Sequence, residues 1–111
     1  MTSKVSVDMP ICGKKTIVTA EKDGADKVKI TLESDCEHIG ELSQNLKSIK
    51  TEDAFLSFGE NPVYSSAMSS NLTPTCLVPC GIMNAVWVET GLISRSLTQN
   101  ETTKELKLKF V

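Results

Sequence analysis

Four cysteines are the residues of this sequence whose type and spacing are best suited to chemistry. They are Cys12, Cys36, Cys76 and Cys80, in a chain of 111 residues. Residues 1–8 contain no apolar stretch of the kind that an export signal requires, so we expect a cytoplasmic protein. In a reducing compartment, several cysteines favour metal binding or redox chemistry over structural disulfides.

Cys76 and Cys80 lie four positions apart, at the start of the clearest helix in the sequence. That helix is expected at residues 79–90, because proline is favoured in a first helical turn and Gly91 is typical of a position just beyond a helix end. The positive end of the helix dipole favours thiolate over thiol. The pair suits metal binding. Alternatively, Cys76 would be the nucleophile and Cys80 the resolving thiol of a thiol redox or persulfide sulfur-transfer protein.

Three strands that alternate apolar and polar residues are expected at residues 4–9, 15–21 and 27–33. Short turns join them, which predicts an antiparallel meander. In an up-down-up meander, the first turn and the end of the third strand lie at the same edge of the sheet. Cys12 falls in that turn and Cys36 directly follows the third strand, so we expect the two to lie close together.

Helical periodicity follows the strands, so the sequence predicts one α+β domain over residues 1–111, an antiparallel β-meander with helices packed on one face. The other expected elements are a helix from about Cys36 to Leu46 capped by Ser34 or Asp35, a helix over residues 51–58, a helix over residues 61–68, a loop over residues 93–103 and an edge strand over residues 105–111.

This arrangement predicts a cluster of cysteines at one edge of the sheet. Cys12 and Cys36 would be joined there by Cys76, with Cys80 as a fourth ligand. Three or four thiolates from separate segments suit a zinc ion or an iron–sulfur cluster. The alternative is that the cysteines are structural and only pack in the core, as free cysteines often do, which would leave an interaction module.

The same residues carry a resemblance. Cys12-Gly13 in a first turn, Cys36 after a third strand and Cys76 at a late helix start resemble the iron–sulfur cluster scaffold proteins of the NifU/IscU type. The cysteine spacings of 24 and 40 positions are similar to that family's. The resemblance spans roughly residues 5–90 and implies a SufE/NifU-like fold, a scaffold role, and sulfur-donor or iron–sulfur-acceptor proteins as partners. Where that family has aspartate, glycine and histidine, this chain has Lys14, Asp35 and Thr75.

The segments Ile11-Cys12-Gly13, Glu33-Ser34-Asp35-Cys36 and Thr75-Cys76-Leu77-Val78-Pro79 also resemble a family of small uncharacterised proteins from anaerobic archaea and bacteria. That resemblance implies no activity.

Several other function classes have no support in the sequence. A net charge of −2 does not indicate binding to nucleic acid or to an anionic membrane. His38, the only histidine, would be turned away from Cys36 on a helix and is expected at the surface. We recognise no glycine-rich phosphate loop, paired carboxylates or Ser–His–Asp arrangement, so a binding protein is favoured over an enzyme. The oligomeric state is left open.

Overall fold

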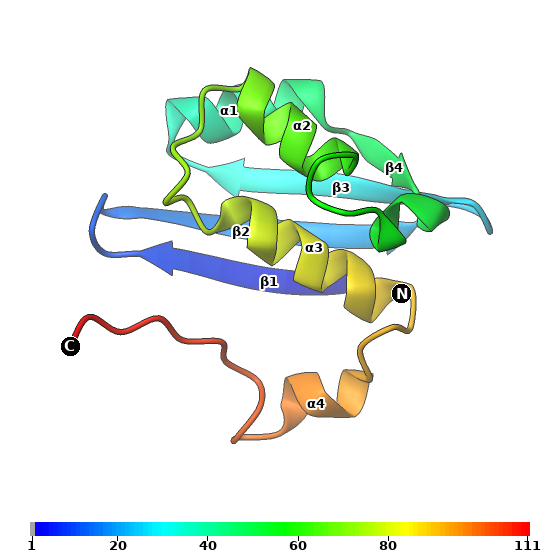
Figure 1. Ribbon diagram of the computed structural model, residues 1–111. Coiled ribbons are helices and arrows are strands. Elements are labelled where there is room, and N and C mark those ends of the chain that lie inside the picture. Colours follow the sequence, from blue (N-terminus) through cyan, green and yellow to red (C-terminus); the bar gives the residue numbers. More distant parts are fainter. Residues whose placement is uncertain (1) are drawn as a thin grey trace.

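The computed structural model describes residues 2–111, so residue 1 of the predicted domain lies outside it. Within these residues, four antiparallel strands form one sheet in the order β1-β2-β3-β4, and helices cover one of its faces (Figure 1). The predicted α+β fold with an antiparallel meander is confirmed. The strands are β1 (Thr2–Met9), β2 (Lys14–Lys22), β3 (Lys27–Ser34) and β4 (Ser48–Lys50).

The strands alternate as the sequence predicts, and β3 shows this most clearly. Val28, Ile30 and Leu32 are buried, whereas the residues between them are exposed. The buried row belongs to the face that the helices cover, so burial of one row of side chains sets which face of the sheet is inward.

Five helical segments follow or interrupt the strands, and α3 is the one packed most closely on the sheet. It lies over β1 and β2, and it buries Ile82, Ala85 and Val86 against them (Figure 1). Gly81 makes this approach possible, because a Cβ atom there would lie 2.5 Å from Cγ2 of Val7. The segments are α1 (Glu37–Asn45), the 3-10 helix η1 (Thr51–Phe55), α2 (Pro62–Ser69), α3 (Val78–Glu89) and α4 (Arg95–Gln99).

The fourth strand is not the one that the sequence suggested. Residues 105–111 form no strand in the structure, and the fourth strand is β4, where buried Ile49 pairs with Val28 of β3. The prediction was wrong because alternation shows that a segment could have one apolar face, without showing that an edge of the sheet is within its reach. The predicted loop over residues 93–103 was wrong in part, since it contains α4.

Two helix starts also differ from expectation. Cys36 is itself the N-cap of α1 and makes no side-chain capping bond, so neither Ser34 nor Asp35 holds that position. The predicted helix over residues 51–58 is the shorter η1. Among the described residues, no helix combines the length and the apolar character needed to cross a membrane.

Candidate functional site

Three of the four predicted cysteines line one small pocket at the end of the sheet where β1 finishes and β2 begins. Cys12, Cys36 and Cys76 all contribute to its wall, together with Met9 and Lys14. The pocket has a volume of about 30 Å³, enough for roughly two water molecules. The structure therefore brings together residues that are far apart in the sequence, as the meander predicted for the first two. All four cysteines are free thiols.

Cys12 is placed by the tight turn between β1 and β2. The backbone N–H groups of Cys12 and Gly13 both donate to the carbonyl oxygen of Met9, at 3.2 and 2.9 Å. Gly13 has φ +72°, a conformation that glycine adopts without strain. The thiol of Cys12 is exposed, and its sulfur lies 3.5 Å from the same Met9 oxygen. This exposed thiol lines the pocket from the turn.

Cys36 is placed by a hydrogen-bonded link between β2, β3 and the start of α1. Its backbone N–H donates to Oγ of Ser34 at 3.2 Å, and Oγ1 of Thr16 donates to the same oxygen at 2.9 Å. Thr16 and Ser34 are partners in the sheet register. Cys36 is half-buried, whereas Cys12 is exposed.

Cys76 lies in the loop before α3, two residues ahead of Val78. Its N–H donates to the carbonyl oxygen of Thr73 at 3.0 Å, which closes a turn. The next residue, Leu77, has its N–H 3.4 Å from Sδ of Met9, so the loop is held against the end of β1. The half-buried Cys76 thereby reaches the wall of the pocket opposite the β1–β2 turn.

The electrostatic setting of Cys76 differs from the expectation that a helix start would favour its thiolate. Burial raises the pKa of the Cys76 thiol, and the neighbouring thiols of Cys36 and Cys12 raise it further. The nearby backbone N–H of Val78, at the start of α3, lowers the pKa, but the net shift is upward. In the metal-free protein, Cys76 is therefore protonated near neutral pH.

Cys80 is not part of this pocket. It is exposed in the first turn of α3, where Nδ2 of Asn84 lies 2.9 Å from its carbonyl oxygen and 3.5 Å from its sulfur. It faces Tyr64 of α2: burial raises the pKa of the Tyr64 hydroxyl, and charge on Cys80 raises it further. The structure thus separates Cys80 from the other three cysteines, and its role as a fourth ligand stays a prediction.

The pocket is not a closed metal site in the conformation described. Among residues 2–111, no three His, Cys, Asp or Glu side chains are arranged as they would be around a metal ion. His38 and Asp35 are exposed and do not line the pocket.

Comparison with known proteins gives a family but no activity. Residues 3–100 match a family of unknown function, DUF6951. The chain belongs to this family. No curated protein and no solved structure matches the chain. The family match includes all four cysteines, whereas residues 101–111 lie beyond it.

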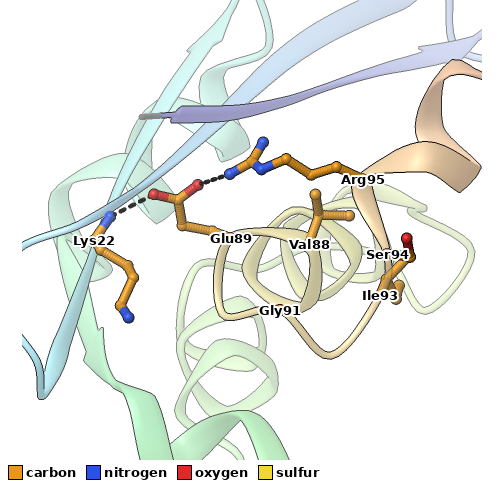
Figure 2. Close-up of a pocket in the computed structure, with 7 residues that line it drawn as sticks. All are labelled: Lys22, Val88, Glu89, Gly91, Ile93, Ser94 and Arg95. Atoms are coloured by element: carbon orange, nitrogen blue, oxygen red, sulfur yellow. Dashed lines mark hydrogen bonds and ion pairs between the residues drawn. The ribbon is translucent and has the colours of Figure 1, made fainter.

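A second cluster of this DUF6951 protein, which the sequence analysis missed, surrounds Glu89 at the far end of α3 (Figure 2). Oε1 of Glu89 accepts hydrogen bonds from Oγ of Ser3 at 2.8 Å and from the guanidinium of Arg95 at 2.7 Å. Oε2 accepts from the backbone N–H of Lys22 at 2.8 Å. The Arg95 guanidinium also donates to the carbonyl oxygen of Thr2 at 3.3 Å. The carboxylate therefore connects α3, α4 and the first two strands.

The same cluster borders a pocket of about 430 Å³ that Lys22, Gly91, Ser94 and Arg95 also line. Burial would raise the pKa of Glu89, but its three hydrogen-bond donors and the charge of Arg95 lower it, and the net shift is downward. Both oxygens of this carboxylate accept hydrogen bonds from groups of the fold itself, which indicates a structural role. The signal in the sequence was a lone carboxylate at the end of an otherwise apolar helix.

Proposed function

We propose that this protein binds zinc or an iron–sulfur cluster through Cys12, Cys36 and Cys76, in the manner of a small scaffold. The observation that supports this most is that three free thiols, supplied by three separate segments, line one pocket at the end of the sheet. In this proposal, sulfur-donor or cluster-acceptor proteins are the partners. They approach the open side of the pocket.

The exposure of Cys12 argues against the alternative that all of these cysteines only pack in the core. A cysteine that only fills space is buried, whereas Cys12 is exposed on a turn. The turn is closed by backbone hydrogen bonds to Met9 and Pro10, which hold the exposed sulfur beside the pocket. In this proposal, the half-buried Cys36 and Cys76 are the inner ligands, and the exposed Cys12 is the outer ligand.

The charge on the three sulfurs supports the same proposal. Thiolates that lie close together repel each other, which contributes to the raised pKa of Cys76 in the protein without a metal. A bound cation reverses this effect, because a coordinating thiol is deprotonated. Lys14, which also lines the pocket, supplies one positive charge beside the sulfurs.

Three protein ligands leave the fourth position of a tetrahedral site open. Cys80 does not line the pocket, so that position is free for water or for a ligand from a partner protein. An open position distinguishes a site that exchanges its ligand from a closed structural zinc site.

The test is the metal content of protein purified without air. We expect stoichiometric zinc, or iron and sulfide with visible absorbance, in the parent protein. Serine variants of Cys12, Cys36 and Cys76 should each lose most of it. Cys80→Ser is the matched control, because it removes a thiol of the same helix start and should keep full occupancy.

Two results would contradict the proposal. One is an anaerobically purified protein that contains no metal and takes none up when reconstituted. The other is a Cys80→Ser variant that loses as much metal as Cys76→Ser. A metal-free protein with a fast-reacting thiol lost in Cys76→Ser would instead favour the thiol redox alternative. The upward pKa shift of Cys76 does not support that alternative.

A further inference from the structure

We propose that residues 105–111 of one copy add as a strand to the free edge of β1 in a second copy, so that two chains form a symmetric dimer by exchanging these segments. The inference does not depend on metal binding by the cysteines. It starts from an apolar segment that has no partner and a sheet edge that has none.

The 105–111 segment leaves its apolar side chains in solvent. Leu106, Leu108, Phe110 and Val111 have exposed fractions of 76%, 80%, 90% and 118%. The first three alternate with Lys107 and Lys109, so an extended chain places them on one face and the lysines on the other. Figure 1 shows this segment as an extended red trace outside the sheet-and-helix layers, on the β1 side. A cluster of exposed apolar residues of this kind marks a contact surface.

The complementary feature is the outer edge of β1. Within residues 2–111, β1 pairs with β2 and with no other strand. Its inward-facing Val5 and Met9 are only half-buried, whereas Val18 and Ala20 in β2 are completely buried. Ser3 and Val7, which alternate with them, are buried, so the row under α3 reaches the edge of the sheet and is partly open at Val5 and Met9. An added strand completes that row and satisfies the unpaired backbone groups of β1.

Residues 105–111 are long enough to pair along most of β1. The segment has seven residues and β1 has eight. At roughly 3.3 Å per residue they span about 23 and 26 Å. The alternation also fits, because Leu106, Leu108 and Phe110 would face the helix side beside Val5, and the lysines would face solvent. Lysines on an edge strand disfavour open-ended stacking, so the expected product is a closed pair.

The start of the segment is held in a way that favours a second copy as the partner. The guanidinium of Arg95, in the first turn of α4, donates to the carbonyl oxygen of Thr2 in β1. The N–H groups of Thr103 and Lys104 donate to the carbonyl oxygen of Asn100, at 3.1 and 2.9 Å, which closes a turn just before the segment. In this arrangement, the segment pairs with no strand of its own sheet. A two-fold exchange buries both segments and both β1 edges at once.

Oligomeric state over a concentration series is the first test. We expect the parent protein to be a dimer by sedimentation or light scattering. Leu108→Lys combined with Phe110→Lys should raise the dimer dissociation constant at least about tenfold, because two apolar side chains lose their burial. The matched control, Lys107→Gln combined with Lys109→Gln, changes the same segment on its polar face and should remain a dimer.

Two outcomes would overturn the proposal. One is a parent protein that stays monomeric at several hundred micromolar. The other is a Leu108→Lys, Phe110→Lys variant with an unchanged dissociation constant. Because Leu108 and Phe110 are exposed in the single chain, the variant is expected to fold, and circular dichroism checks this.

Amide hydrogen exchange of β1 then separates exchange between copies from docking within one chain. We expect protection of the β1 amides to rise with protein concentration and to be lost in the lysine variant. Protection that is independent of concentration would show that each chain uses its own segment, and it would contradict the dimer.

Discussion

At the scale of single residues, the neighbours of Cys76 decide how it reacts. Burial and the nearby thiols of Cys36 and Cys12 raise its pKa, so less of it is thiolate at a given pH than of an ordinary cysteine. Cys80, only one helical turn further along the chain, is exposed and lies outside this cluster. Two cysteines that look equivalent in the sequence therefore have different surroundings.

This difference predicts an order of thiol reactivity in the metal-free protein. At neutral pH, Cys76 should be alkylated more slowly than Cys80. In Cys36→Ser, the pKa of Cys76 should fall, because one of the groups that raises it is gone, and Cys76 should then react faster. Differential alkylation read by mass spectrometry across about pH 7–9, the range around an ordinary thiol pKa, measures both effects. Equal rates for Cys76 and Cys80 would contradict this account.

Glu89 makes a second prediction at the residue scale. Its pKa is lowered in the folded protein, so its contribution to stability is present above the unfolded pKa of about 4.3 and is lost as pH falls through the lower folded value. Glu89→Gln should reduce the free energy of unfolding at pH 7 by about 2 kcal/mol, because buried donors lose their charged acceptor.

Urea unfolding at pH 7 and at pH 3 measures this. The loss caused by Glu89→Gln should shrink at the lower pH, because pH 3 lies below the unfolded pKa and the carboxyl group of the unfolded chain is then protonated. The exposed Glu41→Gln is the control and should change stability little at either pH. A Glu89→Gln variant as stable as the parent at pH 7 would mean that the cluster does not stabilise the fold.

At the scale of elements, the close approach of α3 to β1 depends on Gly81. A Cβ atom there would lie 2.5 Å from Val7, whereas a Cβ atom on Gly40 in α1 would meet nothing within 4 Å. Gly81→Ala should therefore reduce the free energy of unfolding by about 1–3 kcal/mol through overpacking. Gly40→Ala should increase it by up to about 1 kcal/mol, because alanine favours a helix.

Metal content extends this comparison to the site. Gly81→Ala pushes the start of α3 away from β1 and moves Cys76 with it, so occupancy should fall, whereas Gly40→Ala should leave it unchanged. Denaturant unfolding and elemental analysis of both variants provide the measurements. Equal stability of the two variants would show that the packing of α3 tolerates a larger separation.

The elements also show what local patterns can predict. Cys12 and Cys36 were expected to meet because two short turns determine the meander, and the register places the two ends together. The alternation of residues 105–111 led to a wrong prediction, because pairing of this segment with the sheet depends on where the chain lies after α4. The partners of Glu89 could not be predicted either, because Ser3, Lys22 and Arg95 reach its carboxylate only after α3 has packed across the sheet.

At the scale of the whole molecule, α3 runs between the cysteine pocket and the Glu89 cluster. Cys76 precedes its first residue, and Glu89 is its last residue. Thr2 pairs with Glu21 and Met9 pairs with Lys14, so the Glu89 cluster and the cysteine pocket lie at opposite ends of the β1–β2 pair. The Glu89 cluster connects α3 and α4 to the strands at one end, while the other end carries the exposed turn of Cys12. The proposed dimer contact runs along β1 between them.

The position of Cys36 at the N-cap of α1 has a practical consequence for mutagenesis. Sulfur is a poor substitute for the oxygen that usually accepts the first amides of a helix, and here it makes no such bond. Serine at position 36 replaces a weak cap with a favoured one while removing a soft donor atom. If Cys36→Ser raises the free energy of unfolding and also abolishes metal binding, Cys36 contributes to the site as a ligand and not by stabilising the fold.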